Sequence, residues 1–440
     1  MFRDFFILEK ILNIGRKLIP KPVFIFFQPW YHGILALSGA VAFSFPSHKI
    51  KVIGVTGTKG KSTTVYLITK FLEEAGYKVA AIGSLGYKIG DKEWPNNLKM
   101  TMPGRWKIQK FLAQAIKAGC HFAVLEVTSE GIKQKRHFGI KFDAAVFTNL
   151  EKEHIESHGS FEKYYKAKQE LFKKTKNIHI LNADSSYFDL FSKFSSKKKF
   201  FYSLKNDFKF ITNLQGEFNR LNILAAAQAA KSYGVSHEII QKALDKIKNI
   251  PGRLEFIEAG QDFKIVVDYA HTPGSLEAVY KTLKENLKFK GLKLICVLGA
   301  AGGGRDRWKR PIFGQLAENY CDRIILTDED PYDENPLSIL KEIEIGFSKS
   351  EILNPTAIPG SATETRLRTG PSPSREPSTS KSEIILDRRG AIKKALTLAQ
   401  KNDIVVITGK GSENSIAVTR GKKIPWSDKN VILEELKSLT

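Results

Sequence analysis

Short apolar runs alternate with helix-like stretches between residues 49 and 204. The runs are rich in β-branched residues and predict five strands, at residues 50–55, 79–82, 122–127, 144–148 and 178–182. Apolar residues spaced three and four apart, as in 65–75, predict helices between these strands. This alternation is typical of a doubly wound α/β domain built on a parallel sheet.

A second series of strands begins at residue 265, with buried runs at 294–299 and 403–408. It predicts a C-terminal α/β domain of Rossmann-like type. Residues 354–382 are rich in Pro, Ser, Thr, Gly and Arg and lack apolar periodicity, which predicts a disordered insertion in this domain.

The N-terminal segment is predicted to be helical and apolar. Residues 2–18 have apolar positions at helical spacing, and a second apolar run covers 23–45. The run is long enough for a membrane span, but Gln28, Pro29 and His32 favour a pair of helices that packs on the core or lies at a membrane interface. No small-residue cleavage site follows, so we expect no secretory signal. The predicted parts of the chain are residues 1–48, 49–257 and 258–440.

The chain is strongly basic, with 69 Lys and Arg against 46 Asp and Glu, a net charge of +23. This charge favours anionic partners such as nucleotides, nucleic acid or an anionic membrane surface. Basic and aromatic residues are not interleaved as in a nucleic-acid platform, so we do not expect nucleic acid as a partner. A basic P-loop ATPase that acts on nucleic acid or a membrane-bound substrate is the alternative from another class.

Three cysteines, Cys120, Cys296 and Cys321, are far apart in the sequence, and each lies in or beside an apolar run. We interpret them as buried thiols in a reducing cytosol. The pattern predicts neither a disulfide nor a zinc site.

Residues 53–64 read as an apolar strand, a glycine-rich turn and the start of a helix. Gly57 and Gly60 let the backbone bring its N–H groups close to an anion, and the helix points its positive end at the same place. Lys61 is then expected on the β- and γ-phosphates of ATP, and the Ser62 hydroxyl on Mg²⁺. The sequence therefore predicts an ATP-binding loop.

Glu126 ends the predicted strand 122–127, near the predicted loop. A carboxylate at this place can hold Mg²⁺ directly or through water. The alternative is an ordinary surface carboxylate at a strand end.

Motifs follow one another along the chain at residues 57–64, 126–136, 147–172, 215–222 and 268–273, and in this order they resemble those of the Mur ligase family. Asp-Tyr-Ala-His-Thr-Pro at 268–273 is the most specific, because six consecutive residues of mixed type rarely arise by chance. The likeness runs from about residue 51 to 426 and is greatest to the ligases that add the third residue of the peptidoglycan stem peptide. The other segments are residues 100–104, 251–255, 300–311 and 409–413.

For the chemistry, the resemblance implies that His154 binds a second Mg²⁺ and that Lys168 is carbamoylated, which turns a cation into a metal-binding carboxylate. The implied catalytic residues are Lys61, Lys168, His154 and Glu126. The implied Mg²⁺ ligands are Ser62, Glu126, His154 and carbamoylated Lys168. The implied ATP-binding residues are Gly57, Thr58, Lys59, Gly60, Lys61, Ser62, Thr63, Asn219, Asp268 and His271.

The resemblance also implies two groups of substrate-binding residues. The muramyl peptide is expected to contact Thr101, Thr128, Ser129, Gln134 and Arg136. The incoming amino acid is expected to contact Arg305, through its carboxylate, and Asp330, and the resemblance gives Gly411 and Glu413 as further substrate-binding residues. The sequence departs from the family's motifs at Met102, Glu130, Glu153, Tyr332 and Ser412.

Tyr332 stands where diaminopimelate-adding ligases carry an arginine, and acidic residues surround it in 328–334. An acidic pocket without that arginine predicts a basic amino acid such as lysine as the added residue. The alternative is that Arg307 or Arg388 supplies the guanidinium.

The resemblance implies an ATP-dependent amide ligase of peptidoglycan synthesis, in which a muramyl-peptide carboxylate forms an acyl phosphate that an amine attacks. ATP and Mg²⁺ are the implied cofactors, and a muramyl peptide and an amino acid the partners. We expect a cytoplasmic monomer with peripheral membrane contact through residues 1–48. In relatives an N-terminal domain binds the uridine nucleotide, and residues 1–48 take its place, so the acceptor is the standard uridine-diphosphate sugar or a related muramyl compound. A folylpolyglutamate synthase-like ligase is the alternative within the superfamily.

Overall fold

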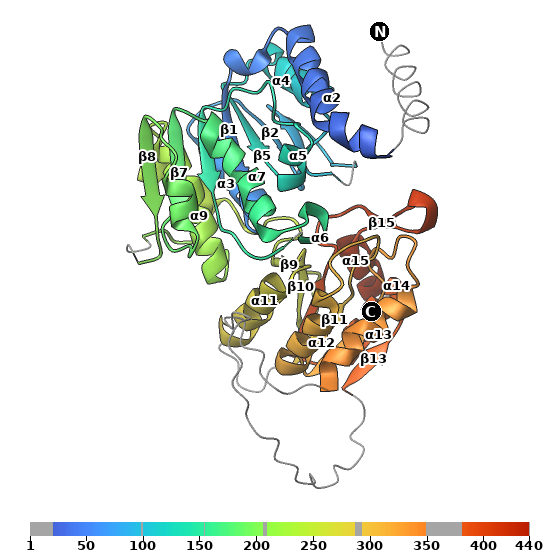
Figure 1. Cartoon of the computed structure of the whole chain (residues 1–440). Coiled ribbons are helices and arrows are strands. Elements are labelled where there is room, and N and C mark those ends of the chain that lie inside the picture. Colours follow the sequence, from blue (N-terminus) through green and yellow to red (C-terminus); the bar gives the residue numbers. More distant parts are fainter. Residues whose placement is uncertain are drawn as a thin grey trace, which may run out of the picture. The chain divides into compact units, whose positions relative to one another are not determined.

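The computed structural model describes residues 21–97, 100–153, 155–205, 209–286, 293–348 and 381–439. The chain forms two compact units, residues 1–248 and 249–440 (Figure 1). The division lies before the boundary expected at residue 257, because strand β9 (Glu255–Ile257) pairs with β10 (Lys264–Asp268) of the second unit.

An eight-stranded sheet forms the centre of the first unit, in the order β4-β3-β2-β5-β1-β6-β7-β8. The five predicted strands are confirmed as β1, β2, β5, β6 and β7, which pair in parallel with one another. β3 and β4 extend one edge as antiparallel strands, and β8 extends the other in parallel. The strands are β1 (Lys51–Thr56), β2 (Val79–Gly83), β3 (Gly86–Ile89), β4 (Lys92–Trp94), β5 (Phe122–Glu126), β6 (Ala144–Phe147), β7 (Ile178–Asn182) and β8 (Lys198–Tyr202).

Helices cover both faces of this sheet (Figure 1). α3, α9 and α10 pack together, whereas α4 and α7 contribute buried side chains to the core on the other face. The helices are α2 (Lys21–Ala42), α3 (Lys61–Glu74), α4 (Arg105–Lys117), α5 (Ser129–Lys133), α6 (Ile155–His158), α7 (Phe161–Lys174), α8 (Phe188–Ser192), α9 (Glu217–Lys231) and α10 (His237–Asp245), with a 3₁₀ turn at Pro46–His48. The doubly wound prediction is confirmed, and β1 lies at its centre with β5 and β6 on either side.

Helix α2 is the described part of the predicted N-terminal helical segment. It packs on α4, where the Trp106 indole N–H donates to Ser38 Oγ at 3.1 Å and a Cβ at Gly39 would lie 3.2 Å from the same ring. Ala36 and Ala40 are fully buried. In the residues that the structure describes, no helix is both long enough and apolar enough to span a membrane. Residues 1–20, which include the first predicted helix, lie outside the described residues.

The β8 edge of this sheet is lined by lysines. Lys197, Lys198 and Lys199 are exposed in succession, and Phe201 follows them with half of its surface exposed. This edge was not predicted as a strand.

The second unit contains a six-stranded sheet in the order β13-β12-β11-β14-β10-β9. All neighbours pair in parallel except β9 and β10. The strands not yet given are β11 (Leu294–Leu298), β12 (Arg323–Leu326), β13 (Ser382–Ile384) and β14 (Ile404–Thr408), with a separate hairpin of β15 (Ser415–Ala417) and β16 (Lys423–Pro425). The predicted strands at 265, 294–299 and 403–408 are therefore present.

Helices flank this second sheet as well (Figure 1). α14 and α15 cover the apolar side chains of β10, β11 and β14, and α11, α12 and α13 pack in series elsewhere. Their bounds are α11 (Pro273–Asn286), α12 (Lys309–Tyr320), α13 (Pro336–Glu344), α14 (Arg388–Leu398) and α15 (Asp428–Leu439), with 3₁₀ turns at Ile345–Ser348 and Thr419–Gly421. The predicted insertion at 354–382 lies outside the described residues except for its last two, and Ser382 begins β13.

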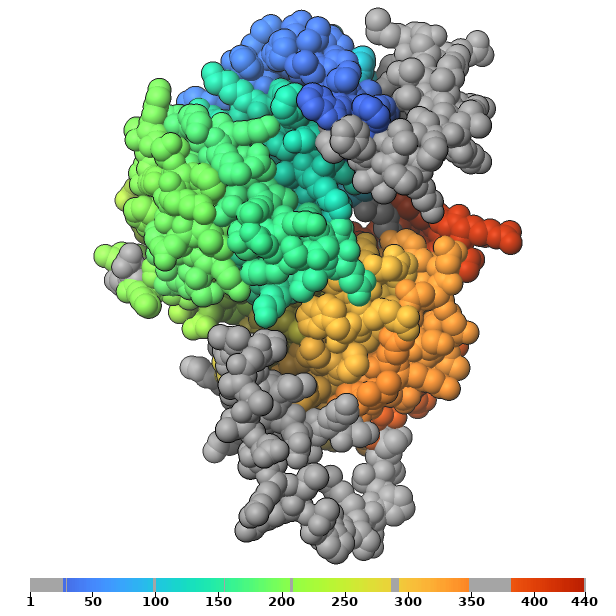
Figure 2. All heavy atoms as spheres, viewed as in Figure 1, coloured from blue at the N-terminus to red at the C-terminus, as the bar shows by residue number. Residues whose placement is uncertain are grey.

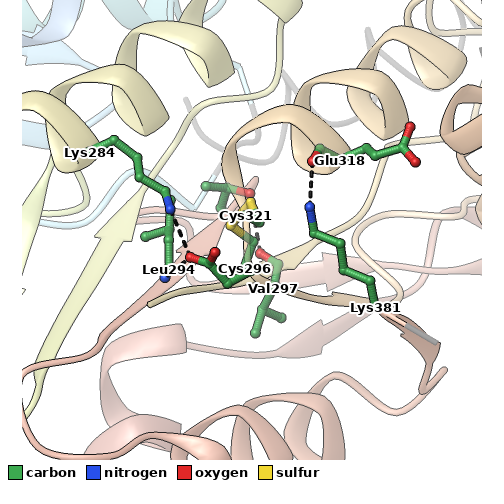
Figure 3. Close-up of a disulfide and its surroundings, with 9 residues drawn as sticks. Lys284, Leu294, Cys296, Val297, Glu318, Cys321 and Lys381 are labelled. Carbon is green, nitrogen blue, oxygen red and sulfur yellow. Dashed lines mark hydrogen bonds and ion pairs between the residues drawn. A yellow bond between two sulfur atoms is a disulfide. The ribbon is translucent and has the colours of Figure 1, made fainter. Parts of the chain in front are cut away.

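The prediction of three free thiols is wrong for two of them. Cys296 on β11 and Cys321 at the end of α12 form a disulfide (Figure 3). The fold brings them together because α12 returns the chain to β12, which pairs with β11 and aligns Cys296 with Ile324. Spacing in the sequence gave no sign of this. Cys120 is a buried free thiol, as expected.

Candidate active site

The loop after β1 has the backbone that the glycines predict. Gly57 and Gly60 have φ of 154° and 76°. A Cβ at Gly57 would lie 1.9 Å from Thr148 Oγ1, and one at Gly60 would lie 2.1 Å from Asn222 Oδ1. Both positions therefore require glycine for space as well as for conformation.

Helix α3 begins at Lys61, directly after this loop, and Ser62 and Thr63 are buried in its first turn. Lys61 Nζ donates to the carbonyl oxygen of Thr58 at 2.7 Å, which curls the side chain back over the loop. The backbone N–H groups and the dipole of a helix N-terminus favour an anion at this place.

Two residues directly after β6 and one from α7 hold the loop in shape. Lys59 N donates to Asn149 Oδ1 at 2.8 Å, and Thr148 Oγ1 donates to the Lys59 carbonyl at 2.6 Å. The hydroxyls of Thr58 and Tyr164 are 3.0 Å apart. The candidate residues from the sequence did not include Thr148, Asn149 or Tyr164.

Lys168 lies under the loop. Its side chain is buried on α7, Nζ donates to the Gly57 carbonyl at 2.6 Å, and Nζ is 4.5 Å from the centre of the Tyr164 ring. Burial and then the charge of Lys61 hold the pKa of Lys168 well below its usual value, against an opposing effect of Glu153 and Glu126. A neutral amine is the form that reacts with carbon dioxide, so this environment suits carbamoylation.

Glu126 is a buried carboxylate, so the reading as an ordinary surface residue is wrong. It ends β5 opposite Val55 of β1, and its Oε2 accepts the Ser84 N–H at 2.9 Å. A Cβ at Gly83 would lie 2.9 Å from the same oxygen. Parallel pairing of β1 and β5 thus brings Glu126 to the edge where the phosphate loop begins.

The Mg²⁺ ligands implied by the sequence divide into two groups. Ser62, Glu126 and Lys168 are buried in the first unit, whereas His154 lies outside the described residues. Among the described residues, no group of three or more His, Cys, Asp or Glu side chains is arranged to hold a metal. The hydroxyl, the carboxylate and a carbamate on Lys168 would supply the oxygen ligands that Mg²⁺ prefers, so the residues fit the ion only with that modification.

A second group of predicted residues gathers near α5. Arg136 is buried and donates to the Met102 carbonyl, and its Nη2 donates to Gln134 Oε1 at 2.7 Å. Its Nε has no hydrogen-bond partner in the described residues, and burial lowers its pKa. A buried guanidinium with an unused N–H is an anion-binding group.

Thr128, Ser129 and Thr101 lie near this group. Thr128 caps α5 by accepting the Gly131 N–H at 3.1 Å, and Ser129 is buried in the first turn. Thr101 Oγ1 is 2.9 Å from Ser84 Oγ, whose backbone N–H binds Glu126. Ser84 therefore links the carboxylate to the second group, a role that no sequence motif indicated.

Asn219 lies in the first turn of α9 and donates to the Gln215 carbonyl at 2.8 Å. Asn222, one turn further on, donates to Asn219 Oδ1 at 3.5 Å and meets Gly60, so α9 contacts the loop through this pair.

The predicted ATP-binding residues Asp268 and His271 belong to the second unit. Asp268 is buried, and its two oxygens accept the N–H groups of Leu254 and Ala270, each at 2.6 Å. Burial raises its pKa, with Arg253 acting in the opposite direction. His271 Nδ1 is 2.8 Å from the Tyr269 carbonyl. A contact of either residue with ATP stays a prediction.

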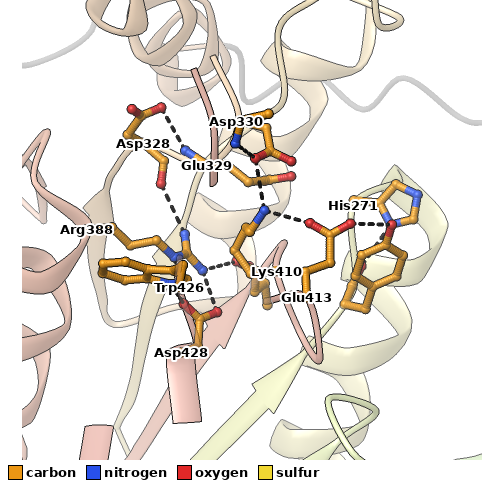
Figure 4. A network of polar contacts seen from close by, with 12 residues as sticks. His271, Asp328, Glu329, Asp330, Arg388, Lys410, Glu413, Trp426 and Asp428 are labelled. Atoms are coloured by element: carbon orange, nitrogen blue, oxygen red, sulfur yellow. Dashed lines mark hydrogen bonds and ion pairs between the residues drawn. The ribbon is translucent and has the colours of Figure 1, made fainter. Parts of the chain in front are cut away.

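Lys410 organises the acidic side chains at the ends of β12 and β14 (Figure 4). Its Nζ is 2.9 Å from Asp330 Oδ1 and 2.6 Å from Glu413 Oε2. Asp330 Oδ1 also accepts the Ala417 N–H at 2.6 Å, and Glu413 Oε1 accepts the Tyr269 hydroxyl at 3.3 Å. Two predicted amino-acid-binding residues, Asp330 and Glu413, thus share one buried cation.

Glu329 lies beside this network. Among the described residues, its Oε2 is buried and has no hydrogen-bond partner. Burial, with a smaller effect of Asp330, raises its pKa to about 7, although Lys410 and Arg388 oppose the shift. A Cβ at Gly409 would lie 2.4 Å from this oxygen.

Arg305 and Tyr332 meet in the second unit. Arg305 is exposed in the loop after β11 and shares a side-chain hydrogen bond with Tyr332, which has φ of 53°. Arg307 pairs with Glu342, and Arg388 forms a buried pair with Asp428 at 2.8 Å, so neither guanidinium is available without breaking an ion pair. Gly411 has φ of 52°, and a Cβ there would lie 2.7 Å from Tyr269 Cβ.

Each unit thus brings together its own share of the predicted residues. The first unit gathers the loop, Glu126, Lys168 and the Arg136 group, and the second gathers Asp330, Gly411 and Glu413. A glycine-rich loop before a helix, with a buried lysine and carboxylate at the edge of a parallel sheet, is the arrangement expected of an α/β enzyme that binds a nucleotide.

Comparison with known proteins gives the family. Residues 55–210 match the model of the Mur ligase middle domain, and residues 252–411 match that of the Mur ligase, glutamate ligase domain. The chain belongs to the Mur ligase family, whose members are ATP-dependent ligases that form amide bonds.

Two relatives show how far the likeness extends. A UDP-N-acetylmuramoyl-L-alanyl-D-glutamate–2,6-diaminopimelate ligase of Clostridium acetobutylicum is 34% identical over 432 residues, covering 92% of this chain and 82% of the relative. The ligase of the same name from Aquifex aeolicus is 35% identical over 418 residues, covering 90% and 79%.

Solved structures agree on the fold. A UDP-N-acetylmuramoyl-L-alanyl-D-glutamate–2,6-diaminopimelate ligase matches with a TM-score of 0.56 and 29% identity, covering 89% of this chain and 79% of the other. Mycobacterium tuberculosis folylpolyglutamate synthase, complexed with ADP and AMPPCP, matches with a TM-score of 0.66 at 14% identity, covering 92% and 94%. At that identity the second likeness shows the fold alone.

Proposed function

We propose that this ligase adds the third residue of the peptidoglycan stem by joining an amino acid to the carboxylate of a UDP-N-acetylmuramoyl dipeptide or a related muramyl peptide. ADP and phosphate are the other products. The observation that carries this proposal is that Lys61, at the start of α3, and the buried carboxylate of Glu126 both act electrostatically on the buried amine of Lys168. The names of relatives that are about one-third identical along nine-tenths of the chain support the choice of acceptor.

In this proposal the first unit activates the acceptor carboxylate. The N-terminus of α3 and Lys61 bind the phosphates of ATP and stabilise the charge of the transferred phosphoryl group. Ser62, Glu126 and carbamoylated Lys168 would hold Mg²⁺, which neutralises phosphate charge when bound. Arg136, with its unused N–H, binds an anionic group of the muramyl peptide.

The second unit supplies the residues for the amino acid. Arg305 binds its carboxylate, with Tyr332 as neighbour. The buried Lys410 fixes Asp330 and Glu413, whose oxygens accept hydrogen bonds from an amino group. The added residue is a diamino acid. The names of the relatives favour 2,6-diaminopimelate, whereas the prediction from Tyr332 is lysine.

We further propose that the enzyme works as a monomer in the cytoplasm and contacts the membrane peripherally through residues 1–48.

The test is a matrix of acceptors and amino acids with ADP release and amide formation as readouts. We expect ADP release only when a muramyl dipeptide, a diamino acid and Mg²⁺ are present together. A folate acceptor serves as the comparison. Turnover with folate and glutamate but not with any muramyl peptide would overturn the proposal, as would ADP release that never yields an amide.

A further inference from the structure

Helix α2 has an apolar face that the rest of the described structure leaves exposed. Trp30, Ile34, Leu37 and Val41 are 70%, 69%, 45% and 58% exposed. Their spacing of four, three and four residues places them along one side of the helix. Figure 2 shows α2, in blue, at the surface of the first unit. Contiguous exposed apolar side chains of this size mark an interaction surface.

The opposite side of α2 is fixed to the protein. Ala36 and Ala40 are fully buried, and the aromatic rings of Phe43 and Trp106 meet edge to face at 5.9 Å. A Cβ at Gly139 would lie 2.9 Å from Ala40 Cβ. The helix therefore cannot turn its exposed side inward without losing this packing, and the apolar face is a permanent feature of the unit.

The segment that carries this face has no acidic residue, and the helix beneath it is basic. The sequence has no charged residue from Pro22 to His48, and no Asp or Glu between Glu9 and Glu73. Helix α4, on which α2 packs, contains four basic residues and no acidic one, and its Lys107 is exposed. An apolar strip on a segment without acidic residues, packed on a basic helix, is complementary to an anionic lipid surface, where acyl chains take up the apolar side chains and headgroups meet the lysines.

The chemistry of the strip also favours lipid over a protein partner. Tryptophan is enriched at membrane interfaces, because its ring is apolar and its N–H is polar. Trp30 to Val41 covers about 16 Å along the helix axis, long enough to lie in the interface plane.

We propose that the exposed face of α2 docks flat on an anionic bilayer through Trp30, Ile34, Leu37 and Val41. This inference rests on the membrane contact proposed above and not on the ligase chemistry. The partner is a lipid surface with negative headgroups, and residues 1–20, a second copy of the chain or a protein are the competing occupants.

Co-sedimentation of the full chain with lipid vesicles tests the proposal. We expect binding to vesicles of phosphatidylglycerol and phosphatidylcholine, and binding weaker by about tenfold or more to phosphatidylcholine alone. The double variant Trp30→Ser, Ile34→Ser should lose about tenfold or more of the affinity for anionic vesicles. Ile211→Ser, at an isoleucine that is 78% exposed elsewhere in the unit, is the matched control and should bind normally.

Ligase activity without vesicles separates this inference from the proposed function. The double variant should keep its activity in solution, because α2 lies outside the candidate site. Equal binding by wild type and the double variant would overturn the docking surface. An absence of vesicle binding would also overturn it. In that case, a concentration-dependent dimer that the double variant loses would identify a second copy of the chain as the occupant of this face. Vesicle binding that appears only after removal of residues 1–20 would identify those residues as the occupant. Vesicle binding without amide formation would overturn the ligase proposal alone.

Discussion

Lys61 is the cation at the start of α3, and its Nζ rests on the Thr58 carbonyl at 2.7 Å. Electrostatic stabilisation dominates phosphoryl transfer, so we expect Lys61→Ala to lower kcat by about 10³-fold or more. Amide formation under saturating ATP measures this loss. Lys70→Ala, in the same helix but ion-paired with Glu73, is the control and should be near normal. Near-normal ligation by Lys61→Ala would exclude the loop from catalysis.

Lys168 is a buried amine whose pKa is lowered, first by burial and then by Lys61. If it carries a carbamate, Lys168→Ala should be inactive, and short carboxylates such as acetate or formate should partly restore turnover by filling the space with an anion. The measurement is kcat with increasing carboxylate concentration. Full activity without added acid would mean that Lys168 only supports the Gly57 carbonyl.

Glu329 makes stability depend on pH. Burial raises its pKa to about 7 in the folded chain, so the native state binds more protons than the unfolded state between about pH 4.5 and 7. Its contribution is greatest below this window and is lost as the pH rises through it, on the order of 3 kcal/mol. Thermal unfolding at pH 5 and 8 should show a smaller difference for Glu329→Gln than for wild type. An unchanged difference would contradict this assignment.

The strands illustrate what pattern can and cannot predict. β5 and β6 are buried along their whole length and consist almost entirely of apolar residues, so the sequence predicted them closely. β8 begins Lys-Lys and β4 is wholly exposed, so neither has the apolar run of a central strand. They form because a neighbouring strand offers unpaired backbone groups, which no local pattern reveals.

The sequence predicted those site residues that belong to recognisable motifs. Residue type and position pointed to Gly57, Lys61 and Glu126, whereas Lys168 came from the resemblance to the family, and the roles of all four stay predictions. Tyr164 and Ser84 were missed, because their contacts join segments far apart in the chain. The Cys296–Cys321 bond was missed for the same reason, since the pairing of β11 with β12 creates it.

We propose that the loop after β12 selects the amino acid. Diaminopimelate carries a distal carboxylate, and leaving that charge without a guanidinium costs roughly 2 to 4 kcal/mol. Arg307 and Arg388 are engaged in ion pairs, and Tyr332 is a neutral donor. We therefore expect a higher kcat/KM for lysine than for meso-diaminopimelate. Lys410 and Arg310 already pair with Asp330 and Glu334, so these two carboxylates add less attraction for a second amino group than their charge alone suggests.

Measurement of kcat/KM for lysine, ornithine and meso-diaminopimelate with one acceptor decides this point. Tyr332→Arg should shift the ratio toward diaminopimelate by about tenfold or more, whereas Tyr332→Phe should not. A wild-type preference for diaminopimelate of about tenfold, roughly 1.4 kcal/mol, would show that another group binds the distal carboxylate.

At the scale of the whole molecule, the disulfide stabilises the second unit and not the first. The Cys296–Cys321 bond closes a loop within the second unit, and Cys120 in the first unit has no partner thiol bonded to it. Reduction should lower the stability of the second unit by about 3 kcal/mol, because the unfolded chain regains conformational freedom. Hydrogen exchange of residues 294–298 with and without reductant measures this change. The double variant Cys296→Ser, Cys321→Ser should not respond to reductant, and identical exchange in both wild-type samples would contradict the expectation.

The lysines along β8 have a consequence for how copies of the protein meet. An outer strand with free backbone groups and a half-exposed Phe201 is a template on which a second copy can add its own strand. Lys197, Lys198 and Lys199 place positive charge along this edge strand. The same strand of a second copy carries the same charge, so the two edges repel each other before their backbones can pair. We expect the same lysines that kept this strand from being predicted to reduce aggregation through it.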